Sequence, residues 1–282
     1  MAGRPARARG ADRSFPQVEY QCGPAALATA LAGAGVKVTP EALVSQVYIP
    51  ERKGSLQIEM MAATRRHGLV AYELAPRFED LLRELAAGTP VIVLQNLGFV
   101  DGWHYAVAVG YDYERGELVL RSGVTERKVL PFAVHEALWK RSGYWAMVAM
   151  PPERIPLTAD EARWLAAIAA LERTGNARSA RAAYRSFLER WPGNLGGAVG
   201  LANAHHALGE LAEAEKVLRQ ASLRAPDSVI VLNNLAQTLA DLGRPEEALP
   251  LIERAAATAG PFAGAVAETR RAILDAIAAK KR

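Results

Sequence analysis

A 34-residue repeat in the second half of the chain constrains its fold more than any other feature. Three segments align without gaps at one offset: "RTGNARSARAAYRSFLERWPGN", "ALGELAEAEKVLRQASLRAPDS" and "DLGRPEEALPLIERAAATAGPF". The shared positions are Gly175, Gly209 and Gly243, then Ala180, Ala214 and Ala248, then Pro192 and Pro226. This spacing predicts a helix, a turn at the glycine, a second helix with a small alanine where the two helices cross closely, and a proline that ends it.

These units resemble the tetratricopeptide repeat, whose period is about 34 residues. The resemblance covers residues 161–262, and the amphipathic segment from Ala265 is expected to be a capping helix. Stacked repeats of this kind leave a concave surface, so the resemblance implies a protein partner there. Docking on the neighbouring domain or dimerisation are the plainer alternatives. His205 and His206 point about 100° apart on a helix and cannot form a paired metal site, and His205 is expected to fill a packing position.

Three prolines interrupt the pattern between Met150 and Glu161 and predict a linker. The expected domains are a disordered basic arm (1–14), a mixed domain (15–150), the linker (151–160), and the repeats with their capping helix (161–282). In the mixed domain helices come first: one runs on from Pro24, a second opens at Thr39, and a third runs from Ser55 to Gly68. Strand-length apolar runs then begin at Leu69, Pro90, His104, Glu117 and Tyr144. Helices followed by strands predict an α+β domain with a largely antiparallel sheet.

Composition excludes several functional classes. A formal charge of +4 over 282 residues is a weak bias and gives little reason to expect a nucleic-acid partner. No apolar run reaches the ~20 residues that span a bilayer, so no membrane span is expected. A single cysteine cannot form an internal disulfide, which leaves cytosol and periplasm open. The first residues lack an apolar signal region, so the chain as it stands is expected in the cytoplasm, whereas a start further upstream would allow export.

Cys22, the only cysteine, lies in "FPQVEYQCGPAALATAL". A lone cysteine is by default buried packing. Here Gly23, Pro24 and a helical run follow it, and its preceding neighbours are polar. The sulfur is therefore expected at a helix N-terminus, where the macrodipole favours thiolate and lowers the thiol pKa. These features favour a nucleophile.

A nucleophilic thiol needs a base, and the chain has five histidines. His67 is expected to be a solvated cation at a helix end, and His135 to lie in a surface helix. His205 and His206 belong to the repeats. His104 follows a Gly-Trp turn and begins the apolar strand "HYAVAVGYD", so its ring can face a helix N-terminus across a cleft. The alternative is a half-buried histidine at a sheet edge.

Together these pieces resemble the papain-like peptidases that cut bacteriocin leaders after a double glycine, and their stand-alone bacterial relatives. The matching segments are "PQVEYQCGPAALATAL", "GTPVIVLQ" and "HYAVAVGYD", within residues 15–150. The resemblance implies an α+β papain-like fold with Cys22 as nucleophile, His104 as general base and acid, and Gln17 as an oxyanion-hole donor. Acyl transfer needs these three roles.

The sequence departs from that family at one position. Family members carry Asp or Asn at the end of the strand after the histidine strand, where it orients the imidazole. Here that strand ends in Ser122 and Gly123. Serine can bond an imidazole but supplies no charge. Asp112 is a poor substitute, because residues eight apart in an extended strand are ~26 Å apart.

The sequence therefore predicts an α+β papain-like cysteine peptidase domain followed by an all-α tetratricopeptide domain. Cys22 and His104 would hydrolyse a peptide bond in a protein or peptide substrate, with no metal or cofactor. Two alternatives stay open: a peptide-binding adaptor that does not cut, favoured by the missing Asp or Asn, and acyl transfer to an amine, as in transglutaminase-like relatives of this fold.

Overall fold

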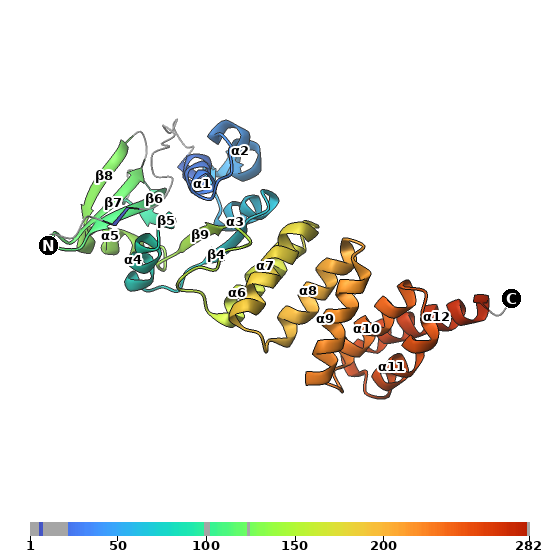
Figure 1. Ribbon diagram of the computed structural model, residues 1–282. Coiled ribbons are helices and arrows are strands. Elements are labelled where there is room, and N and C mark those ends of the chain that lie inside the picture. The colour runs from blue at the N-terminus through green and yellow to red at the C-terminus, as the bar shows by residue number, and fades with distance from the viewer. Residues whose placement is uncertain (1–5, 8–21, 99–101, 123–124, 281–282) are drawn as a thin grey trace. The chain divides into compact units, whose positions relative to one another are not determined.

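The computed structural model of the chain describes residues 6–7, 22–98, 102–122 and 125–280. The chain divides into two compact units, Met1–Thr174 and Gly175–Arg282. The first is an α+β domain and the second is helical, which confirms the predicted fold class (Figure 1).

One antiparallel sheet forms the centre of the first unit, with the strand order β4-β9-β5-β6-β7-β8. In chain order its strands are β4 (Val70–Glu73), β5 (Val91–Asn96), β6 (Trp103–Asp112), β7 (Glu117–Ser122), β8 (Thr125–Pro131) and β9 (Ala146–Met150). All but β8 begin close to the apolar runs that the sequence shows. Strand β6 lies inside the sheet: its first residues pair with β5, and β7 pairs with it from Val107 onward.

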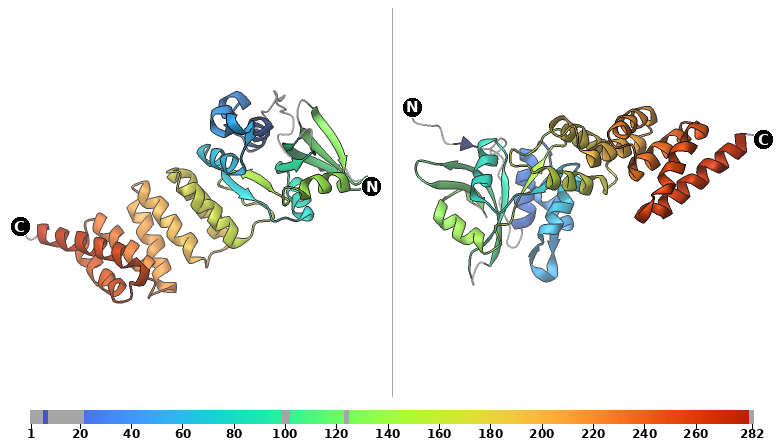
Figure 2. Two further views of the ribbon diagram at one scale, coloured as in Figure 1. Left: turned by 180° about the vertical axis from the view of Figure 1, so that it is seen from behind. Right: turned by 90° about the horizontal axis from the view of Figure 1, so that it is seen from below.

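Helices cover both faces of this sheet (Figures 1 and 2). The first three are α1 (Cys22–Gly33), α2 (Pro40–Val47) and α3 (Gln57–Arg66), and a small hairpin joins β2 (Tyr48–Ile49) through a 3₁₀ turn (Pro50–Arg52) to β3 (Gly54–Ser55). Ile92 and Leu94 of β5 pack with α1 in one core. The other face of the sheet meets α4 (Phe78–Ala86) and α5 (Phe132–Lys140), whose rings Phe78 and Phe132 stack edge-on. The sheet is thus buried on both sides.

Part of the predicted disordered arm has structure. Ala6–Arg7 form strand β1, which pairs antiparallel with Gly110 and Tyr111 of β6. The register of β5 on β6 ends at Ala108, so the backbone of β6 beyond it has an open edge that β1 fills. The rest of residues 1–14 lies outside the described residues.

Residues 151–160, predicted as a linker, are bonded to the first unit. Glu84 of α4 is fully buried, and one of its carboxylate oxygens accepts hydrogen bonds from both the N–H and the hydroxyl of Thr158, each 2.7 Å. The Tyr72 hydroxyl donates to the carbonyl of Thr158 and accepts from the N–H of Asp160. The segment is therefore fixed to the first unit by two side chains, the carboxylate of Glu84 from α4 and the phenol of Tyr72 from β4.

The next helix, α6 (Glu161–Glu172), also packs on the first unit. Trp164 is fully buried and stacks edge-on against Tyr72 at 5.5 Å, and Arg163 donates to the carbonyl of Glu73. The compact unit consequently extends to Thr174, whereas the sequence places the domain boundary before Glu161. Helical periodicity cannot show which neighbour a helix packs against.

The second unit consists of the remaining repeat helices. They are α7 (Ala177–Arg190), α8 (Leu195–Ala207), α9 (Leu211–Arg224), α10 (Val229–Asp241), α11 (Pro245–Ala257), a 3₁₀ turn (Gly260–Phe262) and α12 (Ala263–Lys280). The turn glycines Gly209 and Gly243 have φ of +74° and +76°, a backbone conformation that side chains disfavour. The repeated alanines Ala180, Ala214 and Ala248 are fully buried, as expected where helices cross closely.

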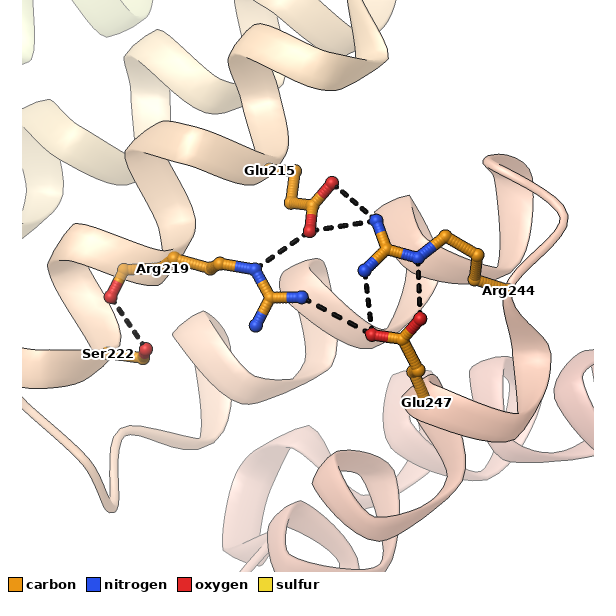
Figure 3. A network of polar contacts seen from close by, with 5 residues as sticks. All are labelled: Glu215, Arg219, Ser222, Arg244 and Glu247. Carbon is orange, nitrogen blue, oxygen red and sulfur yellow. Dashed lines mark hydrogen bonds and ion pairs between the residues drawn. The ribbon is translucent and has the colours of Figure 1, made fainter.

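Ion pairs connect successive repeats, with their charges exchanged from one repeat to the next. Arg181 pairs with Glu210. One period later, at 181 + 34 and 210 + 34, Glu215 pairs with Arg244 at 2.8 Å. Figure 3 shows the second pair inside a network in which Arg244 also bonds Glu247 and Arg219 bridges both carboxylates. The two pairs occupy equivalent positions with opposite polarity.

Candidate active site

Cys22 is the first residue of α1, as the sequence predicts. It is partly buried and packs against the core between α1 and the sheet. Burial raises the pKa of its thiol, and backbone hydrogen bonds with Tyr105 and Gly23 oppose this rise without overcoming it. The expectation of a lowered pKa is therefore wrong, because loss of solvation exceeds the stabilisation that the helix N-terminus gives a thiolate.

The residue after the cysteine has to be glycine. A β-carbon at Gly23 would lie 2.1 Å from Oγ of Ser55, which no side chain tolerates. Ser55 ends the small hairpin and accepts a hydrogen bond at its carbonyl from the Tyr105 hydroxyl, 3.1 Å away. The start of α1 is thereby pressed against a segment that is itself tied to β6.

His104 is the second residue of β6, and its Nε2 is hydrogen-bonded to Oγ of Ser122 at 2.8 Å. Ser122 is buried at the end of the adjacent strand β7. The serine thus holds the imidazole at the position where the sequence comparison expects Asp or Asn. Asp112, at the far end of β6, accepts from the N–H of Arg115 in the following turn.

Tyr105 connects the two candidate groups, and sequence reasoning missed it. Its backbone hydrogen-bonds the Cys22 thiol, and it directly follows His104. Its ring packs edge-on against Trp145 at 5.8 Å. The structure therefore places the thiol beside the strand that carries His104, and brings His104 together with Ser122. Gln17 lies outside the described residues.

Two further histidines differ from their predicted settings. His135 is fully buried, not on a surface helix: its Nδ1 is 2.9 Å from Nε2 of Gln95, and burial lowers its pKa to about 4. His67 ends α3 half-buried, and burial lowers its pKa too, so it is not a solvated cation. The burial of His135 and His67 depends on which face of their helices packs against the core, and the sequence alone does not show this.

The repeat histidines are hydrogen-bonded to carboxylates. Nδ1 of His205 lies 2.6 Å from a carboxylate oxygen of Glu210, and Nε2 of His206 lies 2.7 Å from one of Asp241. The side chain of His205 is largely buried, consistent with a packing position. In the part of the chain that the structure describes, no three His, Cys, Asp or Glu side chains are grouped as metal ligands. No described helix is long and apolar enough to span a membrane.

Protein-family models match both parts of the chain. Residues 11–147 match the Peptidase_C39 like family, and residues 171–233 and 230–259 match tetratricopeptide repeats. The chain combines a peptidase C39-like domain with tetratricopeptide repeats. A search of curated proteins found no match.

Solved structures similar to each half share little sequence with it. A double glycine motif protease of an AMS/PCAT transporter, solved with a leader peptide, is 21% identical with a TM-score of 0.41, over 51% of this chain and 96% of its own. A C39-like peptidase from Bacillus anthracis is 16% identical with a TM-score of 0.43, over 52% and 98%. A tetratricopeptide protein from Thermus thermophilus is 22% identical with a TM-score of 0.37, over 42% and 71%.

Proposed function

We propose that the C39-like domain is a cysteine peptidase, with Cys22 as nucleophile and His104 as base and acid. The observation that carries this proposal is the paired arrangement at the start of β6. Tyr105 hydrogen-bonds the thiol through its backbone, and the preceding His104 is held by Ser122. A thiol at a helix start beside an oriented imidazole is the arrangement that nucleophilic acyl transfer requires.

Burial favours the neutral thiol of Cys22, so the thiol proton has to leave as Sγ attacks. With Nε2 of His104 bonded to Ser122, Nδ1 is the nitrogen that would accept the thiol proton as Sγ attacks the peptide carbonyl. The same nitrogen then protonates the leaving amine, which departs as the thioester forms. Water attacks the thioester, His104 again takes a proton, and thiol and carboxylate product are released. Gln17 would donate to the oxyanion.

The experiment that tests this proposal needs no known substrate. Cell-extract proteins are incubated with wild type, Cys22→Ala or His104→Ala, and newly formed N-termini are identified by mass spectrometry. We expect one set of cleavages that only wild type produces, because nucleophile and base act as one unit. Proteins retained by Cys22→Ala and cut by wild type are the substrates. Identical N-termini from all three forms would contradict the peptidase.

A peptide-binding adaptor is the second candidate, because the thiol is buried and the imidazole is held by a neutral hydroxyl where the family has Asp or Asn. Ser122 variants separate the two functions. A carboxylate would hold an imidazolium through a charge-assisted bond, which is roughly twice as strong as a neutral one. For a peptidase we expect Ser122→Asp to raise turnover and Ser122→Ala to lower it modestly. If wild type and Ser122→Asp are both inactive yet bind the trapped protein as tightly as Cys22→Ala, the domain is an adaptor.

A further inference from the structure

His104 lies between two uncharged polar side chains on one face of the sheet. Gln95 of β5 and His104 of β6 are directly opposite each other in the antiparallel register, and Ser122, which bonds the imidazole, ends β7 on the other side of β6. Side chains of directly opposed residues share a face, with their β-carbons about 4.5–5.5 Å apart. Gln95 and Ser122 therefore flank the imidazole from the two neighbouring strands.

Gln95 is buried and bonded to a second histidine. Its Nε2 lies 2.9 Å from Nδ1 of His135, a fully buried residue of α5, the helix that covers this face. The ring of His135 packs against Phe78 and Trp139, at centroid distances of 6.1 and 5.6 Å. Its Nε2 is buried and has no hydrogen-bond partner among the described residues. A buried imidazole with an unpaired nitrogen costs stability that an apolar side chain would not, which indicates a role beyond packing.

The bond to His135 orients the amide of Gln95. Burial lowers the pKa of His135 to about 4, so its ring is neutral at pH 7, and Nδ1, which faces an amide N–H, is the acceptor. The nitrogen and the oxygen of an amide project in different directions from its carbon. A nitrogen held by His135 therefore leaves Oε1 directed away from that ring. The negative end of the amide dipole is thus available to the side chain opposite Gln95, that of His104.

We propose that Gln95, oriented by His135, is a positioning residue that stabilises the imidazolium of His104. The imidazolium forms when His104 takes the thiol proton of Cys22, and Ser122 offers it only a neutral hydroxyl. A dipole that is already fixed beside a half-buried charge stabilises it strongly, because water screens the interaction little and nothing has to reorient. The dipole acts on the whole ring and leaves Nδ1 to the thiol. This role rests on the proposed peptidase, in which Cys22 and His104 act as a pair.

Alkylation of Cys22 tests this role without a substrate, because the chain has no other cysteine. The rate with iodoacetamide at pH 7 measures the ionisation that His104 assists. The rate at pH 10, where solvent ionises more of the thiol, measures access to it. We expect Gln95→Leu to lower the pH 7 rate about five- to tenfold, the scale by which a bond to a charged group exceeds one to a neutral group, with little change at pH 10. His104→Ala sets the lower limit at pH 7.

A second set of variants separates positioning from stability. Gln95→Leu leaves Nδ1 of His135 unpaired, whereas Gln95→Leu combined with His135→Phe makes both partners apolar and should regain most of the thermal stability. The pH 7 rate of the double variant should stay low, because the amide is absent. As a single variant, His135→Gln offers an oxygen to the amide and should react faster than His135→Phe. Thr64→Val is the matched control: it removes a buried hydrogen bond on α3, which packs on the opposite face of the sheet, and should change stability alone.

Each outcome decides for or against the positioning role. If the double variant regains the pH 7 rate together with its stability, the pair only packs and the proposal is overturned. An unchanged pH 7 rate in Gln95→Leu, or in His104→Ala, overturns it as well. A pH 7 rate that depends on Gln95, without any wild-type-specific cleavage in extracts, would leave the oriented pair of Cys22 and His104 and remove the peptidase. Cleavage that Gln95→Leu does not slow would leave the peptidase and remove the positioning role.

Discussion

The first unit buries individual ionisable side chains such as Glu84 and His135, whereas in the second unit ion pairs lie near the surface and recur along the array. Glu84 and His135 are fully buried, each with its own partner from a distant part of the sequence. Arg244, by contrast, is partly exposed, and its pair with Glu215 repeats the earlier pair of Arg181 and Glu210 with reversed charges. A sheet built from distant segments can bring one ionisable side chain next to a partner from elsewhere in the sequence. A repeat places the same contact at every boundary and can change only the residues that make it.

The largest expected effect comes from breaking the docking of α6. Trp164→Ala removes a fully buried indole and should lower the free energy of unfolding of the first unit by about 3–5 kcal/mol. Trp164→Phe should be much milder, because the indole Nε1 has no partner among the described residues. Hydrogen exchange followed by mass spectrometry measures the protection of the backbone amides in each unit separately. Loss of protection equally in residues 175–282 would show that the two units do not unfold independently.

Acid should weaken the first unit through His135. Its pKa in the fold is about 4, below the ordinary value near 6.5, so the stability that its neutral form contributes is complete above pH 6.5 and is lost as pH falls towards 4. The loss is about 1.4 kcal/mol per pH unit in that window. His135→Gln keeps an acceptor for Gln95 and should flatten the slope in urea titrations at several pH values. An unchanged slope would mean that other groups cause the acid sensitivity.

Glu84 should change the stability of the first unit in the opposite direction with pH, so that its contribution falls as the pH rises. Burial raises its pKa, so its protonated form is favoured in the fold, and the stability present below the unfolded pKa is lost as pH rises through the folded one. Glu84→Gln keeps an oxygen for Thr158 and should match or slightly exceed wild-type stability at pH 7. Glu84→Ala leaves two donors unpaired and should cost about 1–3 kcal/mol. Thermal unfolding compares the three forms, and equal losses for Gln and Ala would contradict this role.

The smallest effect is expected in the repeats. Arg244→Ala removes the bonds to Glu215 and Glu247, yet partly exposed pairs contribute only about 0.2–1 kcal/mol. Glu215→Arg alone should be worse than Arg244→Ala, because it sets two arginines against each other. The double variant Glu215→Arg with Arg244→Glu should recover only part of the loss, because the exchanged charges repel Arg219 and Glu247, which stay in place. A double-mutant cycle by urea unfolding measures this coupling, and strict additivity would mean that the pair is not coupled.

Local signals predicted much of the fold. Thr39 caps α2 at the predicted position, and Cys22 and His104 stand at the starts of their elements. Strand β8 escaped prediction because "TERKVLP" carries charges along an edge of the sheet instead of an apolar run. Glu84 and His135 sit in segments that look solvated, and only the tertiary fold decides which helix face is buried.

The pKa of Cys22 could not be predicted for the same reason. The helix N-terminus is a local feature and is visible in the sequence, while the burial that outweighs it comes from β6 and the hairpin, which are distant along the chain. The hydrogen bond between His104 and Ser122, in contrast, follows from two adjacent strands whose ends the sequence marks.

Because the charges of Arg181–Glu210 and Glu215–Arg244 are exchanged, the two repeat boundaries are electrostatically different, and each arginine or glutamate has a suitable partner only in the present order of repeats. Deleting 34 residues from this array would bring Arg181 opposite Arg244, so the shortened chain would meet like charges where the intact one has a bond. Adding a copy of the middle repeat would place Glu215 against Glu210 of the new copy. A change in the number of repeats would therefore replace an attractive pair by a repulsive one at this position.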